Sequence, residues 1–175
     1  MPAHELEHPA LDQLAGTPEI LRILMAGVTD EIAVQKPAPG RWSLAEVLEH
    51  LSHIEGHMFR TRLDQILASD APMVEPYDEK EFDATGAYSG NEPEESFAHW
   101  EEQRESAVEL IRTLDPMKLM RTGRHPEYGT FTLENLLNNW VCHDLGHVRQ
   151  IAELVRAQTF YPDIGPFQSR YNLKP

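Results

Sequence analysis

At 175 residues, with 41% hydrophobic and 25% charged residues, the chain is long enough to bury a core, and we expect residues 1–175 to form a single domain. Its formal net charge of -14 disfavours binding to nucleic-acid phosphates. No apolar run approaches the length of a membrane span, and the N-terminal segment does not have the pattern of a signal peptide. The one cysteine, Cys142, excludes an intramolecular disulfide and fits a reducing compartment, so we expect a cytoplasmic protein.

Four segments show the 3.6-residue spacing of amphipathic helices, and no stretch alternates strongly enough to predict a strand. The best-defined start is at Ser43, which forms a capping box with Glu46. In the first segment, Thr17 followed by Pro18 is typical of a helix start. The predicted helices are Thr17 to about Val34, Ser43 to about Leu67, Pro93 (capped by Asn91) to Leu114, and Thr132 to Val155.

Four such helices indicate an all-α fold, a four-helix bundle. The short connection at residues 35–42 predicts that the first two helices are antiparallel neighbours. Residues 69–92 are long enough to cross the whole bundle between the second and third helices. The tail after residue 159, rich in proline and aromatic residues, is expected to pack as an irregular cap.

Two histidines of the fourth helix, His143 and His147, are four residues apart and so lie one above the other on one face. That face also carries Trp140 and Ile151, so both rings are expected to point inward. A lone inward histidine is usually a hydrogen-bonded core residue. A pair can be satisfied by one metal ion, and the spacing alone leaves both interpretations open.

The second helix offers three more histidines. His50 lies closest to the apolar side, while His57 and His53 fall further toward the polar edge and are expected to stay outside a metal site. Three neutral imidazoles with one open position form a known catalytic zinc arrangement, and the same donors suit nickel.

Two segments resemble the DinB/YfiT-like family. WSLAEVLEHLSHIE at 42–55 is similar to the family pattern on its second helix, and GTFTLENLLNNWVCHDLGHVRQI at 129–151 is similar to its fourth-helix signature. The segments HPEYG at 125–129 and the closing GPF…RYNLKP also look like segments of family members. The resemblance implies an up-down-down-up bundle with a long crossover, and a metal triad that falls on His50, His143 and His147. It also implies that homodimers are common.

Other candidates for catalysis are weaker. Glu46, one turn before His50, could act as a general base, but the capping box already accounts for it. Asp144 could orient a ligand histidine or pair with an arginine such as Arg41, and the structural pairing is favoured. Gln150 flanks the ligand face and could contact a substrate or face solvent, whereas Cys142 projects away from that face.

Two classes of function remain open. In the first, a divalent metal, zinc or nickel, activates water or a thiol, which gives a hydrolase or a transferase or isomerase that uses a low-molecular-weight thiol and a small-molecule substrate. In the second, the protein is a non-catalytic metal-binding stress-response protein. The absence of a fourth protein ligand favours the enzyme, and the lack of a clear acid or base favours the binding protein.

The long linker is expected to border the site. It carries Tyr77, Phe82 and Tyr88, and an up-down-down-up bundle requires it to return to the end of the molecule where the second helix begins. We therefore expect residues 82–88 to approach the metal ligands and help form the pocket wall.

Overall fold

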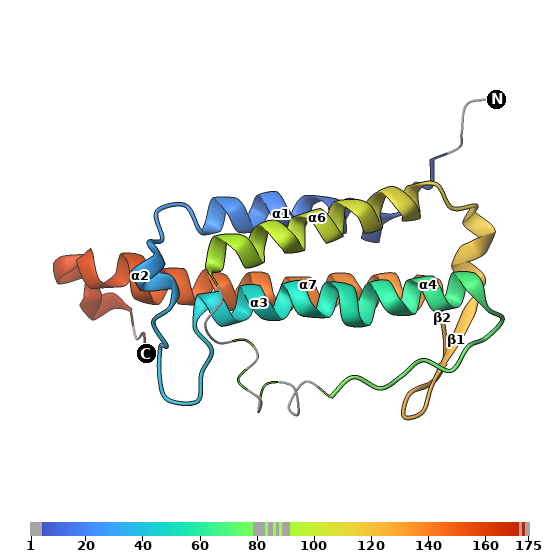
Figure 1. Ribbon diagram of the computed structural model, residues 1–175. Helices are drawn as coiled ribbons and strands as arrows, with labels where there is room; N and C mark the ends of the chain where they lie inside the picture. The colour runs from blue at the N-terminus through green and yellow to red at the C-terminus, as the bar shows by residue number, and fades with distance from the viewer. Residues whose placement is uncertain are drawn as a thin grey trace.

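The computed structural model describes residues 5–78, 83, 86, 88, 92–171 and 173. Four long helical rods lie side by side in a bundle (Figure 1), and a two-stranded hairpin packs at one end. The elements are α1 (Pro9–Leu24), α2 (Asp30–Ala33), α3 (Leu44–Ile54), α4 (Thr61–Ala68), α6 (Pro93–Arg112), β1 (Thr122–His125), β2 (Gly129–Thr132) and α7 (Leu133–Val155). Among these helices none is both long and apolar enough to cross a membrane.

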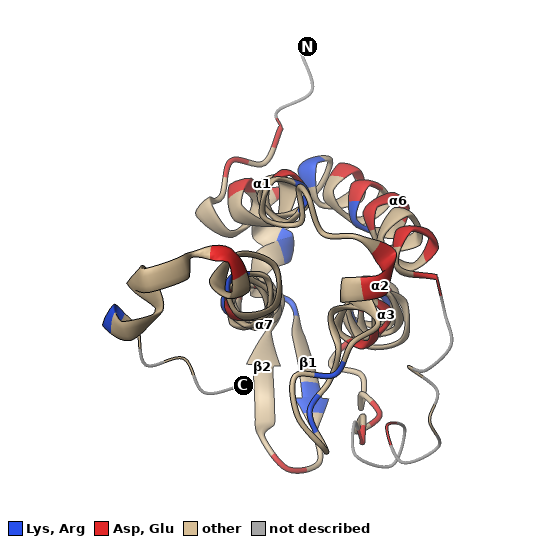
Figure 2. Cartoon of the chain, turned by 90° about the vertical axis from the view of Figure 1, so that its left-hand side faces the viewer, with Lys and Arg blue, Asp and Glu red and all other residues tan. Residues whose placement is uncertain are grey.

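The predicted up-down-down-up topology is confirmed. In Figure 1, α3 with α4 and α6 run in one direction, and α1 and α7 run in the opposite direction. Helix α1 packs against α6 and α7, and α3 packs against the same two helices. The end-on view in Figure 2 accordingly places α1 diagonally across from α3. The prediction that the first two helices are neighbours was therefore wrong, although they are antiparallel, because the connection through α2 crosses the end of the bundle.

The first helix begins eight residues earlier than predicted. Its N-cap is His8, whose Nδ1 accepts from the backbone N–H of Ala10, and Pro18 lies inside the helix. Thr17 is buried and its hydroxyl donates to the carbonyl of Gln13, as a side chain in a helix interior does. The turn Met25–Thr29 then separates α1 from the short α2. A proline pattern that usually marks a helix start thus occurs here in mid-helix.

The second helix has the capping box that the sequence predicts. The Ser43 side chain accepts from the N–H of Glu46, and Glu46 accepts from the N–H of Ser43 at 2.8 Å. Between α3 and α4 the chain forms a π-helical turn over Glu55–Arg60, so one helical rod runs from Leu44 to Ala68. Such turns rotate the side chains that follow and are frequent at functional sites.

The third and fourth helices also start close to the predicted residues. Helix α6 begins at Pro93, and its N-cap is Glu92, while the predicted cap Asn91 lies outside the described residues. Helix α7 begins after Thr132, which forms a capping box with Asn135.

The prediction that the chain contains no strand was wrong. Strands β1 and β2 pair as an antiparallel hairpin, with His125 opposite Gly129. Gly129 has a φ of 76°, which glycine adopts at little cost, so the sequence around it carried a turn signal. The strands have four residues each, too few for alternation to be recognised. The tail likewise differs from an irregular cap, since it forms 3₁₀ turns over Tyr161–Asp163 and Gly165–Arg170.

Arg104 of α6 lies at the centre of the bundle with 1% of its surface exposed. Its guanidinium donates to Glu55 at 2.7 and 2.8 Å and to Asp144 at 2.6 and 3.1 Å. It also donates to the carbonyl of Leu14 at 3.1 Å. In a regular helix that carbonyl would accept from residue 18, but Pro18 has no N–H. One side chain of α6 therefore bonds to each of the other three rods.

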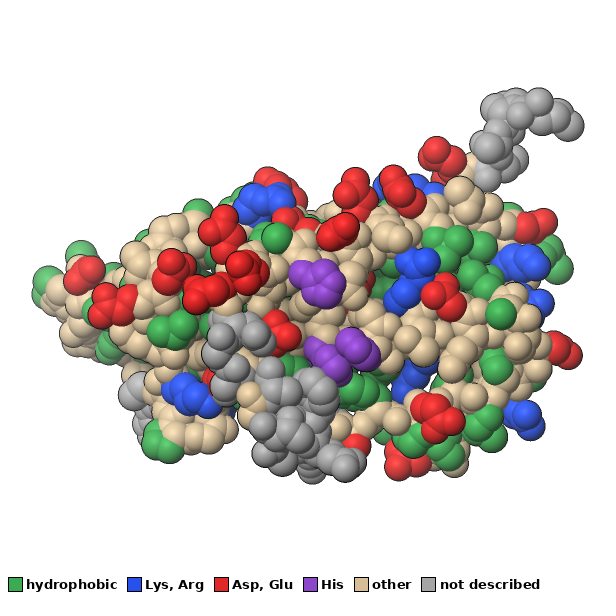
Figure 3. Space-filling model, in the orientation of Figure 1, with side chains coloured by type: hydrophobic (Ala, Val, Ile, Leu, Met, Phe, Trp, Pro, Cys, Tyr) green, Lys and Arg blue, Asp and Glu red, His purple; other side chains and the backbone are tan. Residues whose placement is uncertain are grey.

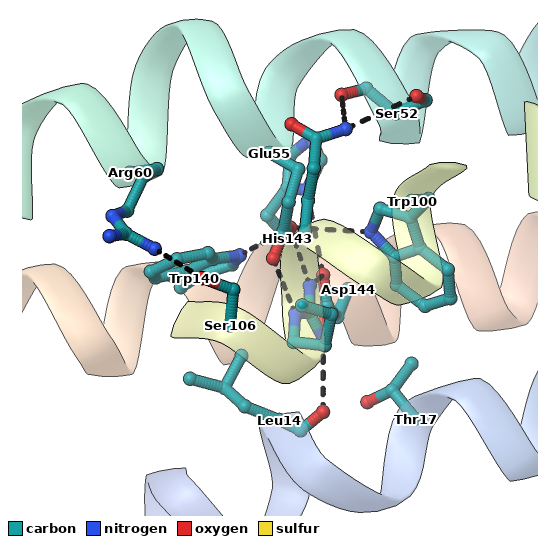
Figure 4. A network of polar contacts seen from close by, with 12 residues as sticks. Leu14, Thr17, Ser52, Glu55, Arg60, Trp100, Ser106, Trp140, His143 and Asp144 are labelled. Carbon is teal, nitrogen blue, oxygen red and sulfur yellow. Dashed lines mark hydrogen bonds and ion pairs between the residues drawn. The ribbon is translucent and has the colours of Figure 1, made fainter. Parts of the chain in front are cut away.

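One of the carboxylates that pair with Arg104, Glu55, has further hydrogen-bond donors. Oε2 of Glu55 also accepts from the indole N–H groups of Trp100 and Trp140, at 3.2 and 3.0 Å. Figure 4 shows Glu55, Asp144 and both indoles converging. Burial alone would raise the pKa of Asp144, but the charge and hydrogen bonds of Arg104 hold that pKa below its ordinary value. Both carboxylates are thus satisfied by N–H donors.

We expect Arg104→Met to lower the free energy of unfolding by about 3–5 kcal/mol, because Glu55 and Asp144 would remain buried without their cation. The matched control is Arg60→Met, which removes the exposed pair with Asp64 and should cost no more than about 1 kcal/mol. Urea unfolding monitored by circular dichroism measures both. Adding Glu55→Gln and Asp144→Asn to Arg104→Met should recover part of the loss, and no recovery would contradict this account.

Candidate metal centre

Three histidines from two helices converge, as predicted. His50 of α3 is buried, and His143 and His147 of α7 are partly buried. Nε2 of His143 lies 3.2 Å from Nε2 of His50 and 3.2 Å from Nε2 of His147. One ring nitrogen from each residue lies within 4.8 Å of the others. The two helices are antiparallel, so residues about 95 positions apart in sequence meet at one level of the bundle.

The other ring nitrogens have partners that orient the rings. Nδ1 of His147 lies 2.9 Å from Oε1 of Gln150, which can only accept, so in the neutral ring the proton is on Nδ1 and Nε2 presents a lone pair. Nδ1 of His50 lies 3.1 Å from the hydroxyl of Tyr88. Nδ1 of His143 is buried, has no hydrogen-bond partner within the described part of the chain, and lies 3.9 Å from Oδ1 of Asp144.

The environment favours the neutral form of two of these rings, His50 and His147. Burial, with the neighbouring His147, His143 and His53, lowers the pKa of His50 to about 2. Burial and His143 lower the pKa of His147 to about 4. Neutral imidazole is the form that binds a metal, so near pH 7 both rings are ready to act as ligands.

The donor set fits a divalent metal ion. Two nitrogen ligands about 2.1 Å from one ion at a tetrahedral angle lie roughly 3.4 Å apart, close to the two spacings of 3.2 Å seen here. A neutral imidazole has only one N–H, and that of His147 is on Nδ1. The three converging Nε2 atoms therefore cannot all be paired by hydrogen bonds to one another. As ligands of one ion they would all be satisfied, with a coordination position left for water or substrate.

Comparison with known proteins agrees with this geometry. The model of the DinB superfamily matches residues 13–151, which is most of the chain. The chain belongs to the DinB superfamily. The putative metal-dependent hydrolase YfiT of Bacillus subtilis is 32% identical over 120 residues, covering 67% of this chain and 66% of YfiT. A putative metal-dependent hydrolase of Oceanobacillus iheyensis is 26% identical over 149 residues, covering 83% of this chain and 84% of that protein.

The fold is also similar to that of a protein of known structure, YfiT from Bacillus subtilis. YfiT superposes with a TM-score of 0.76 at 26% sequence identity, over 90% of this chain and 92% of YfiT. YfiT is described as a probable metal-dependent hydrolase with an unusual four-helix bundle topology.

In the present chain the other two histidines of the second predicted helix, His53 and His57, lie outside the cluster, as predicted. His53 and His57 stack on each other, with ring centroids 4.0 Å apart and planes 12° from parallel. His57 is exposed, and its Nδ1 lies 3.0 Å from the carbonyl of His53. His53 is less exposed than a solvent-facing residue, because Tyr77 and Tyr88 lie against it.

The linker reaches the site through Tyr88, as predicted for residues 82–88. Tyr88 is buried, its hydroxyl contacts His50, and the hydroxyl of Tyr77 lies 3.0 Å from it. Asp83 is exposed and accepts from the indole N–H of Trp42 at 3.0 Å. Phe82 lies outside the described residues.

The two weak catalytic candidates are both engaged elsewhere. Glu46 bonds to Ser43 in the capping box and to Lys36 at 2.7 Å; burial would raise its pKa, but these hydrogen bonds hold it below the ordinary value. Asp144 has a structural pairing, as favoured, but the suggested partner Arg41 was wrong, because Arg104 occupies that position. Cys142 is exposed, in agreement with its predicted direction.

Sequence reasoning missed Arg104, which holds Asp144 in place, and Glu55, the second carboxylate that Arg104 binds. Arg104 lies four residues after Trp100 and three before Ala107, on the buried face of its helix. Glu55 lies four residues after Leu51 and before Phe59 on another buried face. A charged residue at an apolar position of each of two helices is a signal for a buried ion pair.

The pH dependence of stability should report the low pKa of His50. In metal-free protein the folded pKa is about 2 and the unfolded value about 6.5, so below pH 6.5 the unfolded chain takes up a proton that folded His50 does not. Stability from this group therefore falls as pH drops from 6.5 toward 4. Replacing His50 with Leu should make the pH slope of the unfolding free energy shallower by up to about 1.4 kcal/mol per unit. Urea unfolding at a series of pH values measures both proteins. An equal pH slope of the unfolding free energy in the wild type and in His50→Leu would contradict the low pKa of His50.

Proposed function

We propose that the protein is a divalent-metal-dependent hydrolase in which His50, His143 and His147 are the protein ligands of one ion, zinc in the first instance. The observation that carries the proposal is the convergence of three imidazole Nε2 atoms, with that of His143 lying 3.2 Å from each of the other two. The names of two relatives, both putative metal-dependent hydrolases, support the reaction class. When bound, the ion supplies Lewis acidity and a water activated near neutral pH.

The chain's own residues orient the ligands and shape the site. Gln150 holds the proton of His147 on Nδ1, and Tyr88 positions His50, so both Nε2 atoms face the same point. Trp42 and Tyr88 pack against His50, with ring centroids 4.9 and 5.3 Å away, and exclude water from that side. Because Glu46 and Asp144 are held by other partners, we assign neither of them a proton-transfer role.

Metal binding should depend on the three proposed ligands and not on other histidines. We expect His147→Ala and His143→Ala to weaken zinc binding by at least about a hundredfold, since each removes one of three protein donors. His57→Ala is the matched control, because it removes an exposed histidine of the same helical rod as His50 without removing a proposed ligand. Isothermal titration of dialysed protein with zinc measures the affinities. Equal affinities for the wild type and His147→Ala would contradict the ligand assignment.

Hydrolysis should require the ion. We expect zinc-loaded protein to turn over members of a panel of activated esters, amides and phosphate esters, and chelation to remove at least about 90% of that activity until metal is restored. The His147→Ala variant should be inactive at the same zinc concentration. Turnover that appears only after a low-molecular-weight thiol is added would contradict the hydrolase and indicate a thiol-dependent transferase. Tight metal binding without turnover on any substrate would favour a binding protein.

A further inference from the structure

A cavity of about 700 Å³ lies beside the histidine cluster, between the loop at residues 37–42 and the second half of α7. Its wall includes Arg41, Trp42, Gly146, Arg149, Gln150 and Leu154. This volume is in the range of sites that bind small molecules.

The cavity shares walls with the proposed metal centre. Trp42 lines it and also packs against the ring of His50 at 4.9 Å. Gln150 lines it and also bonds to His147 at 2.9 Å. The cavity therefore lies next to two of the three histidines, and Trp42 and Gln150 are the walls that it shares with the proposed metal centre.

The charge of this wall is opposite to that of the protein. The chain carries -14, and acidic side chains are spread over the face in Figure 3 and along the outer side of α6 in Figure 2. Arg41 and Arg149 nevertheless line one cavity, and neither forms an ion pair with any acidic residue of the described chain. The acid on this wall, Glu153, pairs with Arg156 at 3.2 Å. Two guanidinium groups are thus available to a bound anion.

Gly146 keeps part of this space open. It lies in the interior of α7, where glycine costs about 0.5–1 kcal/mol of helix stability relative to alanine. A Cβ added there would meet no atom within 4 Å, so packing does not require glycine at this position. A side chain at 146 would instead project into the cavity that the residue lines.

We propose that this cavity binds the anionic end of the substrate, a carboxylate or phosphate held by Arg41 and Arg149, with the bond to be hydrolysed directed toward the histidines. The direction of the bond to be hydrolysed rests on the proposed hydrolase function, whereas the anion site does not. Guanidinium groups form paired hydrogen bonds with carboxylate and phosphate oxygens, and Leu154 and Ala157 offer an apolar wall to the remainder of the molecule.

The test measures binding to metal-free protein, so that the ion contributes nothing to the affinity. The probes are 3-phenylpropionate and phenyl phosphate, with the neutral 3-phenylpropionamide as the uncharged analogue, titrated calorimetrically into dialysed protein. We expect both anions to bind the wild type at least roughly tenfold more tightly than the amide. Arg41→Gln combined with Arg149→Gln should remove that difference. The control Arg60→Gln, at an arginine of the π-helical turn that does not line the cavity, should preserve it.

A second variant distinguishes binding inside the cavity from non-specific binding to surface charge. Gly146→Leu should weaken binding of all three probes at least roughly tenfold while retaining zinc binding, because the side chain fills space that nothing else occupies. Equal affinity for acid and amide, no binding of any probe, or unchanged anion binding in the double arginine variant would each overturn the proposal. Charge-dependent binding without metal-dependent turnover would contradict the proposed hydrolase function but support the anion site.

Discussion

The buried guanidinium of Arg104 is the interaction on which the rest of the structure depends. It bonds to a carboxylate on the second rod, a carboxylate on α7 and a backbone carbonyl on α1, so it sets the relative level of all four helical rods. A buried ion pair contributes little net stability by itself, because desolvation offsets most of the attraction. It does penalise any sliding of one helix past another, since a shift would leave a charge unpaired in the interior.

That constraint reaches the metal centre directly. Asp144 follows His143 in sequence, so the group that Arg104 anchors is the immediate neighbour of a proposed ligand. Glu55 is five residues beyond His50 and belongs to the π-helical turn that follows α3. The two helical rods that carry the histidines are therefore both bonded to the same arginine, through Glu55 and Asp144. A site built on rigid helices in this way holds its donors in place before any ion arrives.

The histidine site could be foreseen to a large extent, whereas its surroundings could not. His143 and His147 share a face because of helical spacing alone, and His50 was separated from His53 and His57 by its angle around the helix. The same reasoning failed at Thr17 and Pro18, where a typical start signal lies within a helix whose lost hydrogen bond is replaced by Arg104. It failed again at the hairpin, whose short strands are stabilised by pairing with each other and not by an alternating pattern.

By itself the sequence determined the local features: the capped starts at Ser43 and Thr132, the apolar faces of the helices, and the i, i+4 pair of histidines. Each depends on residues within a turn or two of one another, where backbone geometry alone decides the outcome. Only the tertiary structure decided which helices are diagonal, that Asp144 pairs with Arg104 and not Arg41, and that Arg41 and Arg149 line one cavity. These pairings join residues 40 or more positions apart, and they follow from how whole helices pack, which no local pattern encodes.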